Sequence, residues 1–420
     1  MRPLRTAEIL AVGSELLTPF RRDTNSLVLT SRLNELGISV VGKAIVGDDV
    51  AALSATVQAA LTRADLVVLT GGLGPTDDDV TRDAVAQALG LDLDEDPSTL
   101  AAIEARFARR KLAMPAINRR QALVPHGGVV LPNPAGTAPG LWIERGEQVV
   151  VLLPGPPREM RAILEGELGP RLAARSGGRH VERRVIRTTG RPESTIDEIA
   201  SPIYTPWKTA APPIETTILA GGGQIELHLA ATSDGTPAAA AALDRGVAAL
   251  VSALGDIVIS TDGRPIEAVV GDALKARGWM IATAESCTGG GIASRLTDIA
   301  GSSAYVAGGV VAYADAVKTE VLGVPAEMIA AHGAVSEPVA IAMAEGARRR
   351  LGADVGVSVT GIAGPSGGSA AKPVGTVFIG IAVPGGPATA KAFLFLGERA
   401  MVRTQAAMAA LDLVRRTLAS

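Results

Sequence analysis

The chain has 420 residues, which is enough for about three domains of ordinary size and for cores that need no disulfide or structural metal. Its 40 basic and 43 acidic residues give a net charge of −3, so the composition provides no overall basic surface for a nucleic acid. Aromatic residues make up only 3% of the chain, which leaves few side chains on which unpaired bases could stack.

The first 165 residues predict strands that alternate with helices. Apolar runs predict strands at 7–12, 38–46 and 66–70, and apolar residues at helical spacing predict helices at 25–36 and 50–61. This alternation favours a parallel sheet covered by helices on both faces, with right-handed crossovers. Later apolar runs are short and predict hairpin additions to that sheet, at 128–131, 140–144 and 148–153.

A smaller α+β unit is predicted after a linker around 175–179. Its expected elements are strands at 185–188, 214–219 and 224–230, a helix at 194–200, and a helix in the alanine-rich segment after Pro237. A turn at 262–264 follows, and Pro265 is expected at the first position of a helix that ends at Arg277. A second α/β unit begins at Met280, with expected strands at 279–282, 355–359, 376–383 and 391–396 and a helix at 292–296.

The predicted fold class is therefore α/β in three parts. We expect a parallel-sheet domain at 1–170, a small α+β middle domain at 180–261 and an α/β domain at 262–420. The single cysteine, Cys287, cannot form an internal disulfide, so a reducing cytoplasmic location is expected. Residues 1–10 lack the apolar segment of a secretory signal, and glycine, proline and serine interrupt the uncharged stretches, so no membrane span is predicted.

The first candidate site is the glycine-rich stretch at 70–76, which follows a predicted strand and precedes Asp77, Asp78 and Asp79. In parallel α/β sheets ligands bind at the carboxyl ends of strands, and glycines there let the backbone approach a phosphate. Aspartates beside a phosphate suit a magnesium or manganese ion. The alternative is an acidic segment that only caps the next helix.

Other segments are candidates for the same site. Glu15 follows the first strand, and Asn25 lies two residues after Asp23 at the start of the first helix. Two rigid loops of proline and glycine occupy 132–140 and 153–159. On composition alone, these two loops are plain turns.

The second candidate site lies at 284–291, between a strand and a helix. A hydroxyl at such a turn is exposed, and neighbouring backbone N–H groups can form an oxyanion hole. Ser286 is the candidate nucleophile, and because His332 is the only histidine in this domain, Lys318 is the favoured base. Cys287 is a rival nucleophile without an evident histidine partner. The simpler alternative is a loop that holds a phosphate without any covalent step.

The third candidate site is a glycine-rich loop that follows another predicted strand. It contains Thr360, Gly361 and Gly364. Arg399 and Arg403 head the last predicted helix, and an arginine can hold a phosphate through two parallel hydrogen bonds. The alternatives are a flexible surface loop and two solvated arginines.

The ordered motifs resemble those of the CinA family, the competence/damage-inducible proteins, over nearly the whole chain. In the N-terminal part the resemblance rests on AEILAVGSELL, DTN, TGGLGPTDDD, NPAGTAPG and LPGPPREM. In the C-terminal part it rests on TAESCTGGG, GSSAY, YADAVK, GAVSE, TGIAGPSGG, KPVGTV and GERAMVR. The middle part is similar to the small KH-like domain of that family, with much less in common.

The resemblance implies two enzymatic domains in pyridine nucleotide salvage. The N-terminal part looks like the three-layer molybdopterin-binding fold, which in this family is associated with a metal-dependent ADP-ribose pyrophosphatase. That enzyme would yield AMP and ribose 5-phosphate. The C-terminal part looks like the nicotinamide mononucleotide deamidase domain, which would yield nicotinic acid mononucleotide and ammonia without a cofactor.

The resemblance also implies residue roles in the deamidase domain. Ser286 would be the nucleophile and Lys318 its base, with Tyr313 close to the pair. The residues expected to line its substrate site are Cys287, Thr288, Gly289, Gly290, Thr360, Gly361, Gly364, Arg399 and Arg403.

In the pyrophosphatase domain, Asp78 and Asp79 match the paired aspartates that would hold a divalent metal ion of unknown identity, while Asp77 fills a variable place. The residues expected to line its substrate site are Glu15, Asn25, Gly71, Gly72, Gly74, Thr76, Asn133, Gly136, Gly155 and Glu159. The resemblance further implies a homodimer whose partners are small nucleotides, while the charge, the scarce aromatics and the interrupted uncharged stretches argue against a nucleic acid or a membrane as a partner.

This sequence departs from the family pattern at two places. Residues 18–22 read TPFRR where glycine and glutamine are common, which puts the details of the pyrophosphatase loop in question. Ala314 and Asp315 stand where a serine–asparagine pair is usual, close to the expected base. Two alternatives remain open: a regulatory protein of DNA uptake or repair that binds a pterin or nucleotide without turnover, and a molybdopterin-binding protein of molybdenum cofactor assembly.

Overall fold

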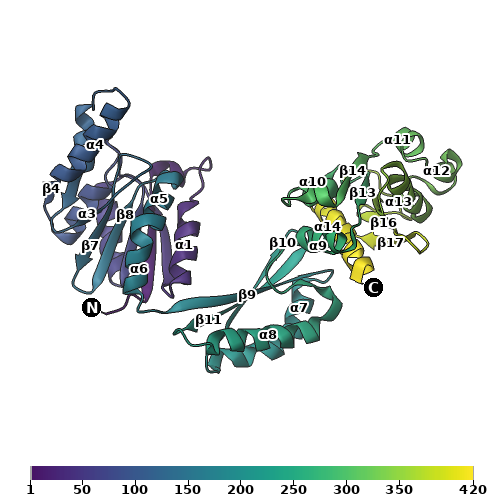
Figure 1. Ribbon diagram of the computed structural model, residues 1–420, viewed down its shortest axis with the longest axis horizontal. Coiled ribbons are helices and arrows are strands. Elements are labelled where there is room, and N and C mark those ends of the chain that lie inside the picture. The colour runs from purple at the N-terminus through teal and green to yellow at the C-terminus, as the bar shows by residue number, and fades with distance from the viewer. Residues whose placement is uncertain (1, 420) are drawn as a thin grey trace. The chain divides into compact units, whose positions relative to one another are not determined.

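The computed structural model describes residues 2–419, which fold into two compact units (Figure 1). The N-terminal unit holds the residues up to Glu182 together with Thr232–Ala240, and the C-terminal unit holds Arg183–Ala231 together with the residues from Ala241 onward. Each unit has its own sheets and its own apolar cores. Most of the predicted middle domain is thus grouped with the C-terminal unit.

The N-terminal unit is built on a six-stranded sheet. Its strands are β1 (Thr6–Val12), β2 (Ser39–Val46), β3 (Leu66–Thr70), β6 (Val129–Leu131), β7 (Gly140–Arg145) and β8 (Gln148–Leu153). The strand order is β2-β1-β3-β8-β7-β6. The first four of these run parallel, and β7 and β6 are antiparallel additions, which confirms the predicted parallel sheet. The run at 148–153 was expected among the hairpin additions, but as β8 it lies parallel beside β3 and joins β7 in a hairpin.

Helices cover both faces of this sheet, as the alternation of elements predicts. One face packs against α1 (Asn25–Glu35), α5 (Pro157–Ile163) and α6 (Gly169–Arg175), and the other against α2 (Val50–Leu61) and α3 (Thr81–Leu89). Successive residues of a strand point to opposite faces, so in β1 Ile9 joins the core beneath α1 and Leu10 joins the core beneath α2.

Several elements of this unit were not predicted from the sequence. They are the helix α4 (Pro97–Arg109), the two-stranded sheet of β4 (Leu93–Glu95) and β5 (Leu123–Pro125), and the short helices η1 (Ser14–Leu17), η2 (Ala116–Ala122) and η3 (Leu164–Leu168). The strands and the η helices carry too few apolar positions for a period to be read. Helix α4 was simply missed, since Leu100, Ile103 and Phe107 stand at helical spacing.

The predicted α+β middle part forms a four-stranded sheet in the order β10-β11-β9-β12 with two long helices. Its elements are β9 (His180–Thr189), α7 (Glu193–Tyr204), η4 (Thr205–Thr209), β10 (Glu215–Gly221), β11 (Gln224–Ser233), α8 (Ala238–Leu254), η5 (Gly255–Ile257) and β12 (Val258–Ser260). The strand β9 begins at His180, five residues before the expected start.

Helix α8 with the turn after it, Ala238–Ile257, is the one helix in the described part of the chain that is long and apolar enough to cross a membrane. A core helix of a protein without membrane spans passes the same test, and α8 does contact the sheet, because Gly246 lies against the side chain of Leu229 in β11. The helix also carries Asp244, which is ion-paired to Arg184. The cytoplasmic location therefore stays a prediction.

A five-stranded sheet forms the centre of the rest of the C-terminal unit. Its strands are β13 (Ile281–Glu285), β14 (Val306–Val311), β15 (Val355–Gly361), β16 (Thr376–Ala382) and β17 (Thr389–Leu394), in the order β14-β13-β15-β16-β17. The first three run parallel and the last two antiparallel. The α/β fold class with mainly parallel sheets is confirmed in both units.

Helices again cover the two faces of this sheet. One face packs against α9 (Ile266–Arg277), α10 (Gly291–Thr297) and α14 (Arg399–Ala419), and the other against α13 (Glu337–Arg350). The remaining helices are η6 (Ser302–Ala304), α11 (Asp315–Glu320) and α12 (Ala326–His332). Pro265 is the residue before α9 and not its first helical residue, because its ψ of 160° is extended.

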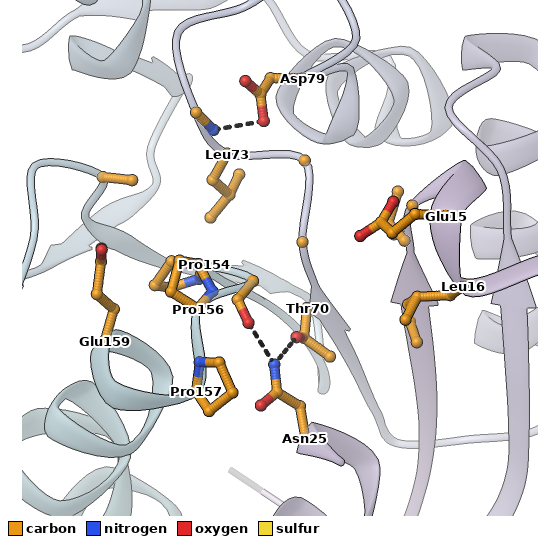
Figure 2. Close-up of a pocket in the computed structure, with 18 of the residues that line it drawn as sticks. Glu15, Leu16, Asn25, Thr70, Leu73, Asp79, Pro154, Pro156, Pro157 and Glu159 are labelled. Atoms are coloured by element: carbon orange, nitrogen blue, oxygen red, sulfur yellow. Dashed lines mark hydrogen bonds between the residues drawn. The ribbon is translucent and has the colours of Figure 1, made fainter. Parts of the chain in front are cut away.

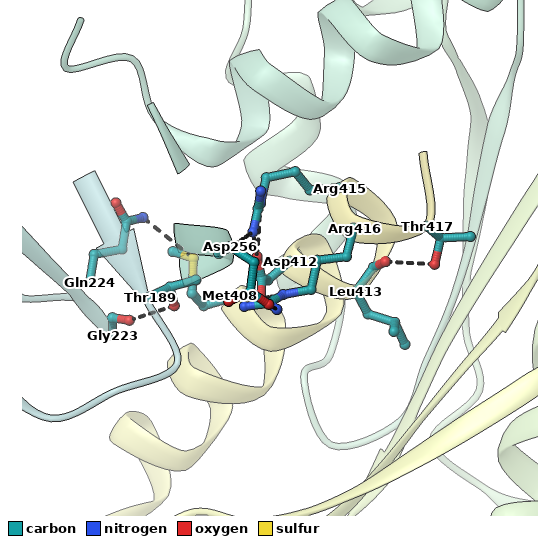
Figure 3. A network of polar contacts seen from close by, with 10 residues as sticks. All are labelled: Thr189, Gly223, Gln224, Asp256, Met408, Asp412, Leu413, Arg415, Arg416 and Thr417. Carbon is teal, nitrogen blue, oxygen red and sulfur yellow. Dashed lines mark hydrogen bonds and ion pairs between the residues drawn. The ribbon is translucent and has the colours of Figure 1, made fainter. Parts of the chain in front are cut away.

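Helix α14 also holds the small sheet of the C-terminal unit through polar contacts (Figure 3). Gln224 of β11 donates a hydrogen bond to the sulfur of Met408 over 3.4 Å. Asp412 accepts hydrogen bonds from Arg415 and Arg416, and both arginines also bond to Asp256. Helix α14 therefore begins at Arg399, and its other end forms polar contacts with the part of the unit that holds the four-stranded sheet.

Candidate functional sites

A pocket of about 850 Å³ opens at the carboxyl ends of the parallel strands β1, β3 and β8 (Figure 2). The loops after these strands begin with Gly13, Gly71 and Pro154, and all three residues line the pocket. This is the edge at which the first candidate site was expected. The structure brings these predicted residues to the pocket wall: Glu15, Asn25, Gly71, Gly72, Gly74, Asp78, Asp79, Gly155 and Glu159.

Glycine is required where the loop leaves β3. Gly71 has a φ of +108°, and a Cβ there would lie 2.1 Å from the carbonyl oxygen of Val12. Gly72 has a φ of +64°, and a Cβ there would lie 2.2 Å from the hydroxyl of Thr81. That hydroxyl donates to the carbonyl of Gly71 over 2.8 Å, so the loop is fixed to the start of α3.

Asp79 organises the same loop from inside. Its carboxylate accepts hydrogen bonds from the backbone N–H of Gly74 (2.6 Å) and of Thr76 (2.9 Å), and from the Thr76 hydroxyl (2.6 Å). The buried guanidinium of Arg82 donates to the carbonyl of Leu73 over 2.6 Å. Burial lowers the pKa of Arg82 to about 10, so the group keeps its positive charge beneath the loop at neutral pH.

The opposite wall of the pocket is held by Asn133 and Glu159. The Asn133 amide donates to Glu159 and to the carbonyl of Ala138, both over 2.7 Å, while its oxygen accepts from the backbone N–H of Gly136 over 2.8 Å. A Cβ at Gly136 would lie only 1.7 Å from the Glu159 carboxylate. Asn133 and Gly136 therefore do not line the pocket themselves. They contact Glu159, which does line it, and fix its position.

Asn25 connects two of the loops at the base of the pocket. Its amide group donates to the hydroxyl of Thr70 and to the carbonyl of Gly155, each over 2.8 Å (Figure 2). Its side-chain oxygen is buried and has no hydrogen-bond partner among the described residues. An unpaired buried acceptor is costly, so this oxygen favours a ligand that donates a hydrogen bond.

The expected metal ligands are Asp78 and Asp79. No group of three histidine, cysteine, aspartate or glutamate side chains in residues 2–419 is arranged to hold a metal ion. Asp79 already accepts three hydrogen bonds, whereas Asp78 is exposed at the pocket. This arrangement fits an ion such as magnesium that keeps waters and substrate phosphates as ligands, and it does not fit a closed protein cage.

In the C-terminal unit, Ser286 lies at the turn between β13 and α10, as predicted, but the residue is buried where an exposed hydroxyl was expected. The residue is 9% exposed, and its backbone N–H donates to the carbonyl of Val359 at the end of β15 over 2.9 Å. Glu285 precedes it and is buried, and its carboxylate accepts from the backbone N–H groups of Ile292 (3.0 Å) and Ala293 (2.9 Å). Glu285 therefore fixes the first turn of α10 to the strand.

The two candidate nucleophiles of this turn differ in chemistry. Burial raises the pKa of the Cys287 thiol to about 11, with Arg399 and Arg403 opposing the shift. The thiolate is the reactive form of cysteine, so at neutral pH this thiol is inert. Cys287 also belongs to the apolar core beneath α14. The raised pKa and the core position of Cys287 favour the Ser286 hydroxyl as the nucleophile, which stays a prediction.

Lys318 is 2% exposed and lies on α11. Its ammonium group donates to the carbonyl of Tyr313 (3.2 Å) and to the carboxylate of Asp315 (3.0 Å). Within residues 2–419 no hydrogen bond joins it to Ser286. Asp315 is one of the positions at which this sequence departs from the family pattern, and the structure makes it the ionic partner of the expected base.

The two arginines at the start of α14 contact the predicted loops. Arg403 donates to the carbonyl of Thr288 over 2.9 Å. Arg399 donates to the carbonyl of Gly364 over 2.8 Å and to the hydroxyl of Tyr313 over 2.9 Å, and Tyr313 is 59% exposed. Arg399 therefore connects the loop at Gly364 with Tyr313, two residues that the family resemblance assigned to one site.

The loop residues themselves are held in two ways. The Thr360 hydroxyl donates to the carbonyl of Ala334 over 2.7 Å. The Thr288 hydroxyl is buried and has no hydrogen-bond partner in the described part of the chain. Gly289 and Gly290 have φ values of +62° and +91°, which turn the backbone into α10. The orphaned Thr288 hydroxyl next to this turn favours a polar ligand.

The sequence analysis missed three features of the candidate sites: the buried Arg82, the buried Glu285 and the ion pair of Asp315 with Lys318. Glu285 stood inside a motif that had already been singled out, and its position at the end of a strand was the available signal. The buried position of Arg82 had no signal, because an arginine beside acidic residues is typical of an exposed helix start.

Comparison with known proteins follows the same division of the chain. The sequence profile of the CinA C-terminal domain matches residues 263–418, and a profile described as a probable molybdopterin binding domain matches residues 8–174. These two matched regions carry the two candidate sites.

Relatives match almost the whole chain. A CinA-like protein of Koribacter versatilis is 46% identical over 98% of this chain and 99% of its own length, and one of Solibacter usitatus is 44% identical over 98% of each. A solved structure, the competence damage-inducible protein A from Klebsiella pneumoniae, is 40% identical over 37% of this chain and 95% of its own, with a TM-score of 0.36.

The fold and the two strand-end sites define a chain with two α/β units, one of them with a molybdopterin-binding-like domain. The full-length identity then fixes the family: the chain belongs to the CinA family.

Proposed function

We propose that the C-terminal unit is an amidohydrolase that converts nicotinamide mononucleotide to nicotinic acid mononucleotide and ammonia. The observation that supports it most is the strand-to-helix turn that presents the Ser286 hydroxyl beside an inert Cys287 thiol. The orphaned hydroxyl of Thr288 and the exposed arginines Arg399 and Arg403 supply groups for a polar, phosphorylated ligand.

In the proposed reaction Lys318 first loses a proton to solvent. Its neutral amine then accepts the hydroxyl proton of Ser286 as the oxygen attacks the carboxamide carbon, and passes that proton to the leaving nitrogen. Ammonia departs as the acyl–serine ester forms. Water then attacks the ester, its proton returns through Lys318 to Ser286, and the carboxylate product leaves. The backbone N–H groups of Thr288 and Gly290 would stabilise the oxyanion, since the N–H of Gly289 already donates to the carbonyl of Ser286 over 3.1 Å. Lys318 must turn from Asp315 toward Ser286 for this, since the two do not hydrogen-bond in the structure.

The test is release of ammonia from nicotinamide mononucleotide by the full chain. We expect turnover by the wild-type protein and almost none by Ser286→Ala or Lys318→Met. Absence of ammonia release by the wild-type chain, or full activity of Ser286→Ala, would contradict the proposal.

We further propose that the N-terminal unit hydrolyses the pyrophosphate of ADP-ribose, giving AMP and ribose 5-phosphate. The observation that supports it is the 850 Å³ pocket at the strand ends, with a glycine-rich loop on one side and exposed carboxylates on another. Asp78 would be the main protein ligand of a divalent ion that neutralises charge on the phosphates, and Asp79 would contribute less to holding that ion. Turnover that is unaffected by EDTA would contradict the metal requirement.

A second candidate for this unit is pterin binding without turnover, which the molybdopterin-binding profile favours. Titration with molybdopterin and with ADP-ribose under identical conditions distinguishes the two ligands. The proposed partners are small nucleotides and a second copy of the chain, and the homodimer is tested by the mass of the protein in solution.

A further inference from the structure

The charge around the N-terminal pocket is unbalanced. Among the described residues that line it, the acidic side chains are Glu15, Asp23, Asp48, Asp78, Asp79 and Glu159. The cationic side chains that line it, within the same set, are only Arg21 and Arg22. A ligand that carries phosphate groups would meet repulsion from the carboxylates unless these two arginines, or a metal ion, offset that charge.

Both arginines are available to bind an anion. They are exposed, and neither forms a hydrogen bond or an ion pair with another residue of the described chain. Other arginines near the pocket are already occupied: Arg120 pairs with Asp77, and Arg82 bonds to the carbonyl of Leu73. A guanidinium without a protein partner, placed at a pocket wall, is a ready bidentate ligand for a phosphate.

Phe20 precedes these arginines and also lines the pocket. Its side chain is 88% exposed, in a chain with only five phenylalanines. An exposed aromatic ring at the mouth of a pocket offers a flat apolar face, and purine bases stack on such a face. Phe20 directly precedes the two cations in the sequence, and all three residues line the same pocket, so one bound molecule with a base and a phosphate is a ligand that suits this set.

The segment that carries these residues is anchored at both ends. Before it, the Thr18 hydroxyl donates to the carbonyl of Glu15 over 2.6 Å. After it, the Asp23 carboxylate accepts from the backbone N–H of Ser26 over 3.0 Å at the start of α1. Pro19, Phe20, Arg21 and Arg22 lie between these anchors, and the side chains of the last three have no polar partner in the described chain.

We propose that Phe20, Arg21 and Arg22 form a nucleotide clamp, in which Phe20 stacks on the base and the two arginines bind the phosphates of a nucleoside 5′-phosphate or diphosphate. The inference rests on the proposed function of the N-terminal unit for the identity of the substrate. It assigns specificity to the residues 18–22 at which this sequence departs from its family.

The test measures binding to the full chain by calorimetry, in EDTA, with AMP, ribose 5-phosphate and adenosine as probes. We expect Phe20→Ala to weaken AMP and adenosine about tenfold and to leave ribose 5-phosphate unchanged. The double variant Arg21→Gln/Arg22→Gln should weaken AMP and ribose 5-phosphate at least about tenfold, leave adenosine unchanged and reduce the salt dependence of AMP binding.

The matched control is Arg145→Gln. Arg145 is an exposed arginine of the same unit that pairs with Gln148 at the start of β8, which is the end of the sheet away from the pocket. It should change none of the three affinities. Thermal unfolding of each variant should match the wild type, because no partner is lost.

The clamp is overturned if the wild-type chain binds none of the probes, or if Phe20→Ala weakens ribose 5-phosphate as much as AMP. Failure of the proposed reaction looks different. A wild-type chain that binds AMP in a Phe20-dependent way but does not hydrolyse ADP-ribose with any divalent metal would leave the clamp in place and remove the pyrophosphatase activity.

Discussion

The N-terminal and C-terminal units place glycine-rich loops at the ends of parallel strands, but they expose different chemistry there. In the N-terminal pocket the candidate functional carboxylates, such as those of Glu15 and Asp78, are exposed to solvent. In the C-terminal unit Ser286, Thr288 and Lys318 are buried. An open acidic site suits a ligand that arrives with counter-ions, whereas a buried hydroxyl site suits a reaction from which water must be excluded until the second step.

The largest expected effect concerns the buried site. Replacing Ser286 by alanine should lower ammonia release from nicotinamide mononucleotide by about 10³-fold or more, because a nucleophile is lost. Hydrolysis of ADP-ribose by the same protein should be unchanged, since the serine belongs to the other unit. Cys287→Ala is the matched control and should keep activity within about tenfold. If Cys287→Ala lost far more activity than Ser286→Ala, Cys287 would be the nucleophile.

The next effect concerns the backbone of the open site. Gly71→Ala should destabilise the N-terminal unit by about 3 kcal/mol, because its Cβ would meet a carbonyl oxygen at 2.1 Å and its φ is +108°. Gly90→Ala is the control: its φ is +65°, but a Cβ there meets nothing within 4 Å, so about 1 kcal/mol is expected. Denaturant unfolding of both variants measures the difference. Equal losses of stability would mean that the loop shifts to make room for the Cβ at position 71.

A smaller effect separates the two aspartates. Asp79→Ala should cost about 2 kcal/mol of stability, because three hydrogen bonds to the Gly74–Thr76 segment are lost. Asp78→Ala should leave stability unchanged and weaken the binding of magnesium in the presence of ADP-ribose. Unfolding curves and a magnesium titration of the two variants check this. If only Asp78→Ala lost stability, Asp78 would be the residue that holds the loop and Asp79 the candidate metal ligand.

The smallest effect depends on pH. The folded pKa of Cys287 is raised from its ordinary value of 9.0 to about 11, so the folded chain keeps a proton that the unfolded chain releases. Stability should therefore fall as pH rises from 9 to 10, by about 1 kcal/mol from this group. Cys287→Ala should remove that part of the slope. A steeper slope in the variant would contradict the shift, as would alkylation of native Cys287 by iodoacetamide at pH 7.5.

Much of the fold could be predicted because long periodic segments carry their own signal. The helix at 50–61 and the strand at 66–70 agree with the structure to the residue. Short elements such as β4 and β5 could not be predicted, because three residues show no period. The site was predictable where glycine follows a strand, as at Gly71. It was not predictable where contacts join distant segments, as when Arg399 bonds to Tyr313, 86 residues earlier.

The network at the end of α14 has a practical consequence for dividing the chain. A fragment that begins at 262 would lack Asp256 and Gln224, and so would expose Met408 and leave the outer bonds of Arg415 and Arg416 unmade. A fragment that begins at Arg183 keeps all of these partners. Fragments for crystallisation or for assays of the serine site should therefore begin no later than Arg183, because the small sheet helps to hold α14, and with it Arg399 and Arg403, in place.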